Sequence, residues 1–397
     1  MAEAPEFPFN IFDPAVKADP YPLYAAMRAT GPVIANPFLA GQFMVGGYDD
    51  VLTLLNDPET FSNGRLSGPT ADSVFLAPTM LNADPPDHER LRSVVSRAFT
   101  PRSVTELEGR MQQVARDLLA PLADGAPYEV VADLAERLPV LVIAEMLGVG
   151  TADLEDFVEW SHGLLGVLDM FASAEAAQHA QESSKHLHDY FAAEVARRCD
   201  HPTEDDLVGR LVAANADGRL SEAEMLSSCV LLLLGGNETT TRLIANAVLA
   251  LARHPDERAR LAADPALLPT AVDEVLRFDT PVQGNARIAT RATELAGVDI
   301  PDGSLVVGLL GSANRDPAHF DDPDRFDVGR NPNPHLAFSR GIHFCLGANL
   351  ARLEARAALG ELLRVAPDYE LMTQEAELEY GPTFFFHSPA RLEISRR

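Results

Sequence analysis

Cysteine, basic residues and long apolar runs are all scarce in this sequence of 397 residues. Its 3 cysteines, Cys199, Cys229 and Cys345, are scattered and odd in number. This argues against a disulfide framework and fits a reducing compartment, so we expect a cytoplasmic protein. The absence of a CxxC pair and of HExxH argues against zinc binding. The longest dense apolar run, residues 229–234, is far shorter than the ~20 residues that span a bilayer.

The N-terminus and the net charge narrow the range of partners. Residues 1–6 have neither a basic start nor an apolar run, so we expect no signal peptide and no membrane anchor. The chain carries 32 Lys and Arg against 59 Asp and Glu, a formal net charge of −27. This surplus disfavours non-specific binding to nucleic acid or to an anionic membrane. We therefore expect neither as a partner.

Residue patterns predict a mainly α fold with a small β portion. Apolar residues recur at helical spacing over most of the chain, beginning with residues 21–30. The β-richer parts lie near residues 35–65 and 285–310, where short apolar runs are separated by turn residues. Hydrophobic residues make up 46% and charged residues 23%, an ordinary globular balance. No long linker is visible, so we predict a single large domain over residues 1–397.

A long central helix is predicted over residues 221–253. Ser221 and Glu224 form a capping box at its start, and Pro255 ends it. At 1.5 Å per residue this helix would be roughly 50 Å long.

The middle of this helix, residues 235–241, has a sequence that is poor for helix formation. It contains two glycines and three threonines, and threonine hydroxyls can take helical carbonyls from the backbone ladder. We therefore expect a local opening of the helix. Two interpretations stay open on these residues alone: a tight helix–helix crossing at the glycines with Glu238 solvated, or a functional groove.

Residues 338–347 form a short loop with one cysteine and two glycines before a predicted helix at 348–363. A cysteine just before a helix lies near free backbone N–H groups and the positive end of the helix dipole, which favours its thiolate. Gly341 and Gly347 allow tight turning and close approach to a flat group. A lone cysteine is more often a small buried apolar residue, but a thiolate in a fixed loop can also bind a metal or act as a nucleophile.

The spacing in this loop resembles the haem-binding loop of the cytochrome P-450 family, the haem-thiolate monooxygenases. The matching residues are Phe338, Gly341, His343, Cys345 and Gly347. Ser339 stands where most bacterial members carry Gly, and we expect only a local adjustment there. The resemblance runs from about residue 21 to the C-terminus. It implies the P-450 fold of the bacterial type, with the long helix over a haem b (iron protoporphyrin IX) and Cys345 as the iron ligand.

The middle of the long helix resembles the oxygen-binding groove of the same family. The matching residues are Gly235, Gly236, Glu238 and Thr239. The resemblance implies that the Thr239 hydroxyl holds oxygen and a water by hydrogen bonds, while Glu238 relays protons from solvent. Gly235 replaces a frequent alanine, which could admit a bulkier substrate group.

Glu274 and Arg277 lie three residues apart on a predicted helix over residues 271–278. Such a pair is commonly solvated and worth a few tenths of a kcal/mol. The resemblance instead implies a buried structural network behind the haem, with Arg325 or Arg330 as a further partner.

Haem propionates need cationic or hydrogen-bonding partners when buried. The resemblance implies His88, Arg92, Arg287 and His343 for this role. His88 and Arg92 share one helix face at a spacing of four, which fits an exposed basic face equally well.

The resemblance also implies a substrate pocket that is largely apolar. Its expected lining comprises parts of residues 164–171 together with Val74, Phe75, Leu76, Met80, Leu231, Gly235, Val282, Gln283, Phe384 and Phe385. We therefore expect a hydrophobic substrate, such as a terpenoid, a steroid, a fatty acid or a macrolide precursor of secondary metabolism.

The implied reaction inserts one atom of O2 into the substrate by hydroxylation or epoxidation. No GxGxxG follows a predicted strand, so we expect no flavin or nicotinamide segment, and electrons must come from a partner. We expect a ferredoxin and its reductase as the electron donors, and we expect a monomer. The arginines of residues 90–102 would dock that ferredoxin. Three alternatives remain. The first is a peroxygenase that uses hydrogen peroxide, although the presence of Glu238 and Thr239 argues against it. The others are a non-enzymatic haem sensor or carrier, and a cysteine hydrolase with His and Asn partners for Cys345.

Overall fold

The computed structural model divides the chain into two compact units. It describes residues 4–7, 10, 13–37, 39, 41–66, 75–150, 153–165, 174–381 and 385–397. Unit 1 comprises Met1–Leu66, Asn246–Cys345 and Gln374–Ala390, and unit 2 comprises Ser67–Ala245, Leu346–Thr373 and Arg391–Arg397. The prediction of a single domain stays a prediction.

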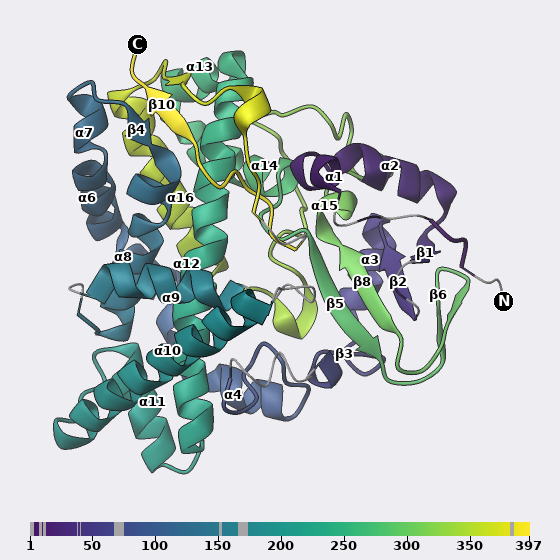
Figure 1. Cartoon of the computed structure of the whole chain (residues 1–397), viewed down its shortest axis with the longest axis vertical. Coiled ribbons are helices and arrows are strands. Elements are labelled where there is room, and N and C mark those ends of the chain that lie inside the picture. The colour runs from purple at the N-terminus through teal and green to yellow at the C-terminus, as the bar shows by residue number, and fades with distance from the viewer. Residues whose placement is uncertain are drawn as a thin grey trace. The chain divides into compact units, whose positions relative to one another are not determined.

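Unit 1 is built around a sheet with the strand order β1-β2-β8-β5-β3 (Figure 1). Its strands are β1 (Val33–Ala35), β2 (Gln42–Val45), β8 (Leu305–Leu309), β5 (Gly284–Ala289) and β3 (Phe61–Ser62), with a hairpin of β6 (Thr293–Leu295) and β7 (Val298–Ile300). Its helices are α1 (Pro14–Ala18), α2 (Tyr21–Thr30), α3 (Tyr48–Asn56), α13 (Pro255–Ala263), α14 (Leu268–Phe278) and α15 (Leu310–Ala313). Short 3-10 turns occur at η1 (Gly64–Leu66), η7 (Pro265–Leu267), η8 (Gly341–His343) and η9 (Glu375–Glu377).

The two faces of this sheet pack against different helices. Successive strand residues point to opposite faces. Val45 and Val306 therefore join the core of α3, whereas Met44 and Val307 join the core of α2. β2 runs parallel to β8, and β8 pairs antiparallel with β5. In this register Arg287 of β5 lies opposite Val306 of β8.

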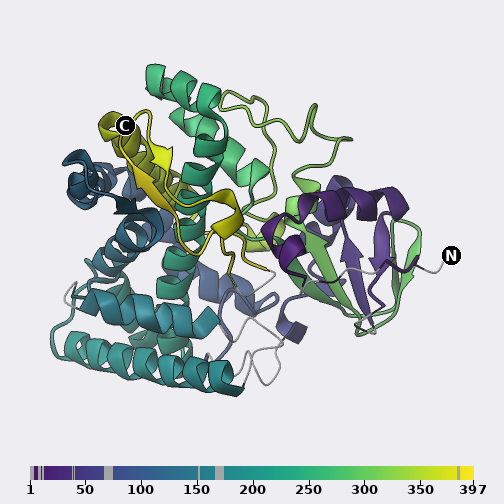
Figure 2. The same cartoon turned by 45° about the horizontal axis from the view of Figure 1, so that its top comes forward.

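Unit 2 is mainly helical. Its helices are α4 (Asp87–Val95), α5 (Pro101–Thr105), α6 (Glu108–Leu118), α7 (Ala120–Ala123), α8 (Arg137–Leu147), α9 (Leu154–Leu165), α10 (Ala174–Asp200), α11 (Leu207–Ala216) and α16 (Ala348–Val365). It also holds η3 (Ser96–Phe99), a π-helical turn η4 (Val131–Ala135), and the strands β4 (Tyr128–Glu129), β10 (Glu393–Ser395) and β9 (Glu370–Leu371) in one small sheet. α9 and α10 pack side by side (Figure 2).

The long predicted helix is α12 (Glu222–Arg253), whose residues up to Ala245 belong to unit 2. The Ser221 hydroxyl accepts from the Glu224 N–H at 3.2 Å, and the Glu224 carboxylate accepts from the Ser221 N–H at 2.8 Å, so the capping box is present. The mainly α fold with a small β portion is also confirmed. Over the described residues, no helix combines the length and apolar character that crossing a membrane would require.

Candidate active site

The cysteine loop lies in unit 1 and is fixed by backbone hydrogen bonds. The Cys345 N–H donates to the Phe338 carbonyl at 2.9 Å, and the Phe344 N–H donates to the Gly341 carbonyl at 3.1 Å. The Ser339 N–H donates to the carbonyl of Leu336 at 2.8 Å. Cys345 is only partly buried. The thiol therefore sits on a loop whose backbone path is set by the chain itself.

Two residues of this loop have left-handed backbone conformations. Gly341 has φ 68°, and a Cβ on it would lie 2.6 Å from the Leu55 carbonyl oxygen of α3, so only glycine fits there. Ser339 has φ 61°, a region in which a non-glycine residue costs on the order of 1 kcal/mol. The adjustment expected at Ser339 therefore takes the form of a serine held in a glycine-like conformation.

Two glycines leave room for a flat group. Gly347 is the N-cap residue of α16 and offers no side-chain cap to the first helical N–H groups. A Cβ on Gly347 or on Gly235 would meet no described atom within 4 Å beyond its own chain neighbourhood. A partly exposed thiol on a fixed loop, with small residues at these positions, is a set of residues that fits haem.

The Gly235 to Thr239 stretch of α12 stays helical, so the predicted opening is not present as a break in the helix. The Thr239 hydroxyl donates to the Gly235 carbonyl at 3.2 Å and so takes a helical acceptor as predicted. A Cβ on Gly236 would lie 2.9 Å from Ile143 of α8, which shows a tight crossing at the glycine. Glu238, however, is 3% exposed, so the alternative of a solvated Glu238 is wrong.

Glu238 belongs to a charged cluster within unit 2. Its Oε2 accepts from Arg242 Nη2 at 3.2 Å, and its Oε1 lies 3.8 Å from His162 Nε2 of α9. His162 Nε2 is in turn 3.1 Å from an oxygen of Glu136, the N-cap residue of α8. Burial raises the pKa of Glu238, although the charges of Arg242 and His162 oppose that shift.

These three partners of Glu238 were not predicted from the sequence. Arg242 stands one helical turn after Glu238, so its spacing could have predicted the ion pair. His162 and Glu136 come from other helices, and no local pattern connects them with α12.

The predicted propionate residues divide between the two units. His88 is buried on α4, and its pKa is lowered first by burial and then by the charge of Arg92 on the next turn. In unit 1, Arg287 is buried on β5, where Nη1 donates to the Ala286 carbonyl at 2.7 Å, and His343 ends the turn η8. The structure brings His88 and Arg92 together, and the joint propionate role of all four residues stays a prediction.

Glu274 and Arg277 form a buried ion pair in unit 1. Arg277 Nε and Nη2 each donate to the Glu274 carboxylate at 2.8 Å, and both side chains are fully buried. Arg330 Nε also donates to Glu274, at 3.1 Å. Of the two candidate meander arginines, Arg330 is therefore the partner, whereas Arg325 contributes its backbone carbonyl to Arg277.

The pocket residues of unit 2 gather beside α12. The Ala77 N–H donates to the Ser227 hydroxyl at 3.1 Å, which ties residues 75–80 to α12 one turn before Leu231. Leu231 is buried, Phe75 and Met80 are half-buried, and Leu76 is exposed. Val74 and residues 166–171 lie outside the described part of the chain.

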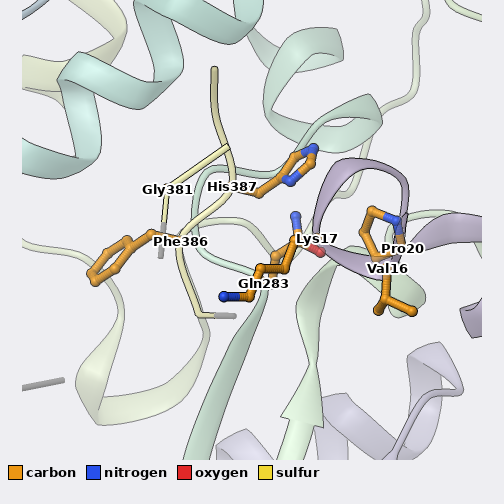
Figure 3. A pocket seen from close by; sticks show the side chains of 7 residues that line it. All are labelled: Val16, Lys17, Pro20, Gln283, Gly381, Phe386 and His387. Atoms are coloured by element: carbon orange, nitrogen blue, oxygen red, sulfur yellow. The ribbon is translucent and has the colours of Figure 1, made fainter. Parts of the chain in front are cut away.

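The pocket residues of unit 1 also lie close to one another. Val282 pairs with Phe386 in an isolated bridge, and the Gln283 N–H donates to the Phe385 carbonyl at 2.9 Å. Phe384 lies outside the described residues. Gln283 borders a small pocket with His387 (Figure 3), whose volume of about 10 Å³ holds about one water molecule and no organic substrate. One substrate pocket formed by all the predicted residues stays a prediction.

Comparison with known proteins agrees with the loop and helix motifs. The family model for cytochrome P-450 matches residues 40–375. The vitamin D(3) 25-hydroxylase of Pseudonocardia autotrophica is 37% identical over 393 residues, covering 97% of this chain and 96% of that protein. The structure of a myxobacterial cytochrome P-450 in complex with myristic acid is 39% identical, with a TM-score of 0.89, covering 98% of each chain. P-450BioI, in complex with an acyl carrier protein ligated to hexadec-9Z-enoic acid, is 34% identical with a TM-score of 0.89, covering 96% of this chain and 100% of that one. The chain belongs to the cytochrome P-450 family, the haem-thiolate monooxygenases.

Proposed function

We propose that this enzyme hydroxylates or epoxidises a hydrophobic small molecule with O2 and with electrons from a ferredoxin-type partner. The observation that carries this proposal is the conjunction of a fixed cysteine loop around Cys345 with an acid–alcohol pair, Glu238 and Thr239, on α12. In the net reaction, the substrate, O2, two protons and two electrons give the oxygenated product and one water molecule.

Cys345 would ligate the iron of haem b through its thiolate. His88, Arg92, Arg287 and His343 would bind the propionates, since buried carboxylates need cationic or hydrogen-bonding partners. A thiolate-ligated haem supplies electron donation that favours cleavage of the O–O bond. Glu274 and Arg277 would hold the segment before the cysteine loop in place through their contacts with residues 323–330.

Glu238 and Thr239 would deliver and hold protons. Glu238 is buried, and burial raises its pKa, so its carboxylate takes up a proton and passes it on more readily than an exposed one. The Thr239 hydroxyl, which donates to the Gly235 carbonyl, can accept a hydrogen bond at the same time. This pair supports a monooxygenase that consumes protons over a peroxygenase that does not.

The substrate is proposed to be a long apolar molecule of the size of a fatty acid or a steroid. The side chains gathered beside the first half of α12 are apolar, namely Phe75, Met80 and Leu231. A pocket lined by such side chains selects its substrate by the shape and the apolar surface area of the substrate. The vitamin D(3), myristic acid and hexadecenoic acid named for the related proteins have the same apolar character.

The ferredoxin is proposed to dock on Arg97 and Arg102. Both side chains are exposed. Arg102 makes only a solvent-exposed ion pair with Glu106 at 3.4 Å, whereas Arg90 is held by Glu224 at 2.6 Å. An acidic partner needs such a local positive patch, because the chain as a whole carries −27.

The test is turnover under 18O2 with NADPH, a ferredoxin and its reductase, after a binding screen of C14 to C16 fatty acids and steroids. We expect one 18O atom in the product and a rate that falls at least tenfold in Glu238→Gln and Thr239→Ala, the order expected for a proton-transfer group. Turnover with hydrogen peroxide alone would favour the peroxygenase. Tight binding without any product would favour the carrier.

A further inference from the structure

A cluster of four charged residues lies in unit 2, at α8, α9 and α12 (Figure 1). Its members are linked in the order Glu136, His162, Glu238 and Arg242. His162 Nε2 stands between the two carboxylates, 3.1 Å from Glu136 and 3.8 Å from Glu238. Two carboxylates and one guanidinium leave one negative charge, which a proton on His162 balances. The cluster is therefore built to hold one exchangeable proton.

Exposure within this cluster falls steeply from His162 to Glu238. The His162 side chain is 44% exposed, whereas Glu238 is 4% exposed. Arg242, the other partner of Glu238, is 12% exposed and remains a cation, so it cannot donate protons repeatedly. Among these four residues, only His162 both reaches solvent and can take up and release a proton near neutral pH.

One oxygen of Glu238 is directed toward His162 without a hydrogen bond. Within the described part of the chain, Glu238 Oε1 is buried and makes no hydrogen bond, while Oε2 is occupied by Arg242. A shift of the His162 ring by about 1 Å from 3.8 Å would bring Nε2 within hydrogen-bond range of that oxygen. The shift would lengthen the bond to Glu136, so His162 can alternate between the two carboxylates.

We propose that His162 is the proton-uptake residue of this enzyme, passing protons from solvent to Glu238. The imidazolium gives its Nε2 proton to Glu238 Oε1, and the neutral ring then regains a proton from water. Two such transfers supply the two protons of each turnover. This inference rests on the proposed monooxygenase function, and His162 is a positioning residue because it acts through Glu238.

The groups around His162 raise its pKa on balance. The hydrogen bond to Glu136 raises the pKa of His162, burial lowers it, and the charges of Glu238 and Arg242 raise and lower it respectively. A further titratable group near His162 comes from α10, which packs on α9 and places His179 beside Gly163, the residue that follows His162. The raised pKa favours the protonated form of His162 compared with a free imidazole.

The first experiment measures the proton itself. In the haem-loaded ferrous carbonmonoxy protein, which is diamagnetic, histidine-labelled NMR should show His162 titrating above 6.5. The resonance is assigned by its loss in His162→Gln. In Glu238→Gln the same titration should move to lower pH, because one neighbouring negative charge is gone. A His162 titration at or below 6.5 that Glu238→Gln leaves unmoved would overturn the inference, and this result does not depend on turnover.

The second experiment measures proton delivery during turnover. His162→Gln keeps a hydrogen-bonding side chain but cannot titrate. We expect its kcat to fall about tenfold at pH 7, less than for a group that transfers the proton directly, since water can partly replace it. Less product should form per NADPH, and the wild-type decline of rate above the His162 pKa should disappear. Substrate Kd and the carbon monoxide spectrum should stay unchanged.

His186→Gln is the matched control. His186 is an exposed histidine of α10 that contacts Trp160 of α9, so the substitution removes an imidazole from the same helix pair. It should leave the pH profile and the product yield unchanged. His162→Asn serves as a second variant if His162→Gln does not fold. If a folded His162 variant keeps the pH profile and product yield of the unsubstituted enzyme, the proton-uptake role of His162 is refuted. If the unsubstituted enzyme binds substrate but makes no product, the monooxygenase proposal is refuted instead.

Discussion

Replacement of Glu274 by glutamine should destabilise unit 1 strongly. The Glu274 carboxylate accepts from Arg277 Nε and Nη2 at 2.8 Å each, from Arg330 Nε and Asn333 Nδ2 at 3.1 Å, and from the Asp327 N–H at 3.0 Å. Both Glu274 and Arg277 are fully buried. Glutamine has nearly the same shape, so the substitution changes charge and acceptor number without creating a cavity.

The magnitude follows from the hydrogen bonds that the amide cannot make. Whichever way it is oriented, its NH2 group faces at least two donors, and hydrogen bonds to charged groups are worth about 1.5–3 kcal/mol each. Breaking a buried ion pair by removing one partner costs about 3–5 kcal/mol, because the other charge stays buried. We expect a loss of about 4 kcal/mol, and at about 2.1 cal/mol/K per residue this lowers the Tm of the chain by about 5 °C.

The assay is urea unfolding of the haem-loaded protein followed by circular dichroism, with thermal unfolding beside it. Glu375→Gln is the control, since Glu375 pairs with Arg253 on the surface of the same unit. Exposed pairs contribute about 0–1 kcal/mol, so the control should change stability little. A Glu274→Gln variant that loses less than about 1 kcal/mol would refute the reasoning that the buried charge network holds this region.

Two further substitutions test buried ionisable groups of unit 2. Burial raises the pKa of Glu354 far above 4.5, so the carboxyl is neutral in the folded chain and ionised in the unfolded chain at neutral pH. The free energy of unfolding therefore falls as pH rises above about 4.5. In urea unfolding, the Glu354→Gln variant should be as stable as wild type at pH 4 and more stable at pH 8. Parallel curves of unfolding free energy against pH for the two proteins would contradict this. Arg198 is fully buried, 2.6 Å from Glu194 and 2.9 Å from Asp206, so Arg198→Met should cost about 3–5 kcal/mol in the same assay. The exposed Arg197→Met should cost less than about 1 kcal/mol, and equal losses would disprove the role of the buried pair.

Local signals were sufficient for the elements that carry the family motifs. The capping box and Pro255 predicted the bounds of α12, because helix ends are decided by side chains within a few residues. The turn of the cysteine loop at Gly341 is also a local feature, since its φ of 68° is a conformation that glycine adopts freely.

The environment of Glu238 could not be predicted from the sequence. Its burial depends on α8 and α9 packing against α12, and His162 and Glu136 reach it from those helices. The choice between Arg325 and Arg330 was also open, because either arginine could reach Glu274 until the path of the meander was known.

The central claim, a haem held by Cys345, is tested most directly by the carbon monoxide difference spectrum of the dithionite-reduced protein. We predict the red-shifted Soret band that gives the family its name. This band should be lost in Cys345→Ser and kept in Cys199→Ser, since Cys199 is exposed and has no assigned role. An unshifted band in freshly prepared wild-type protein, or the absence of a haem band, would contradict the claim.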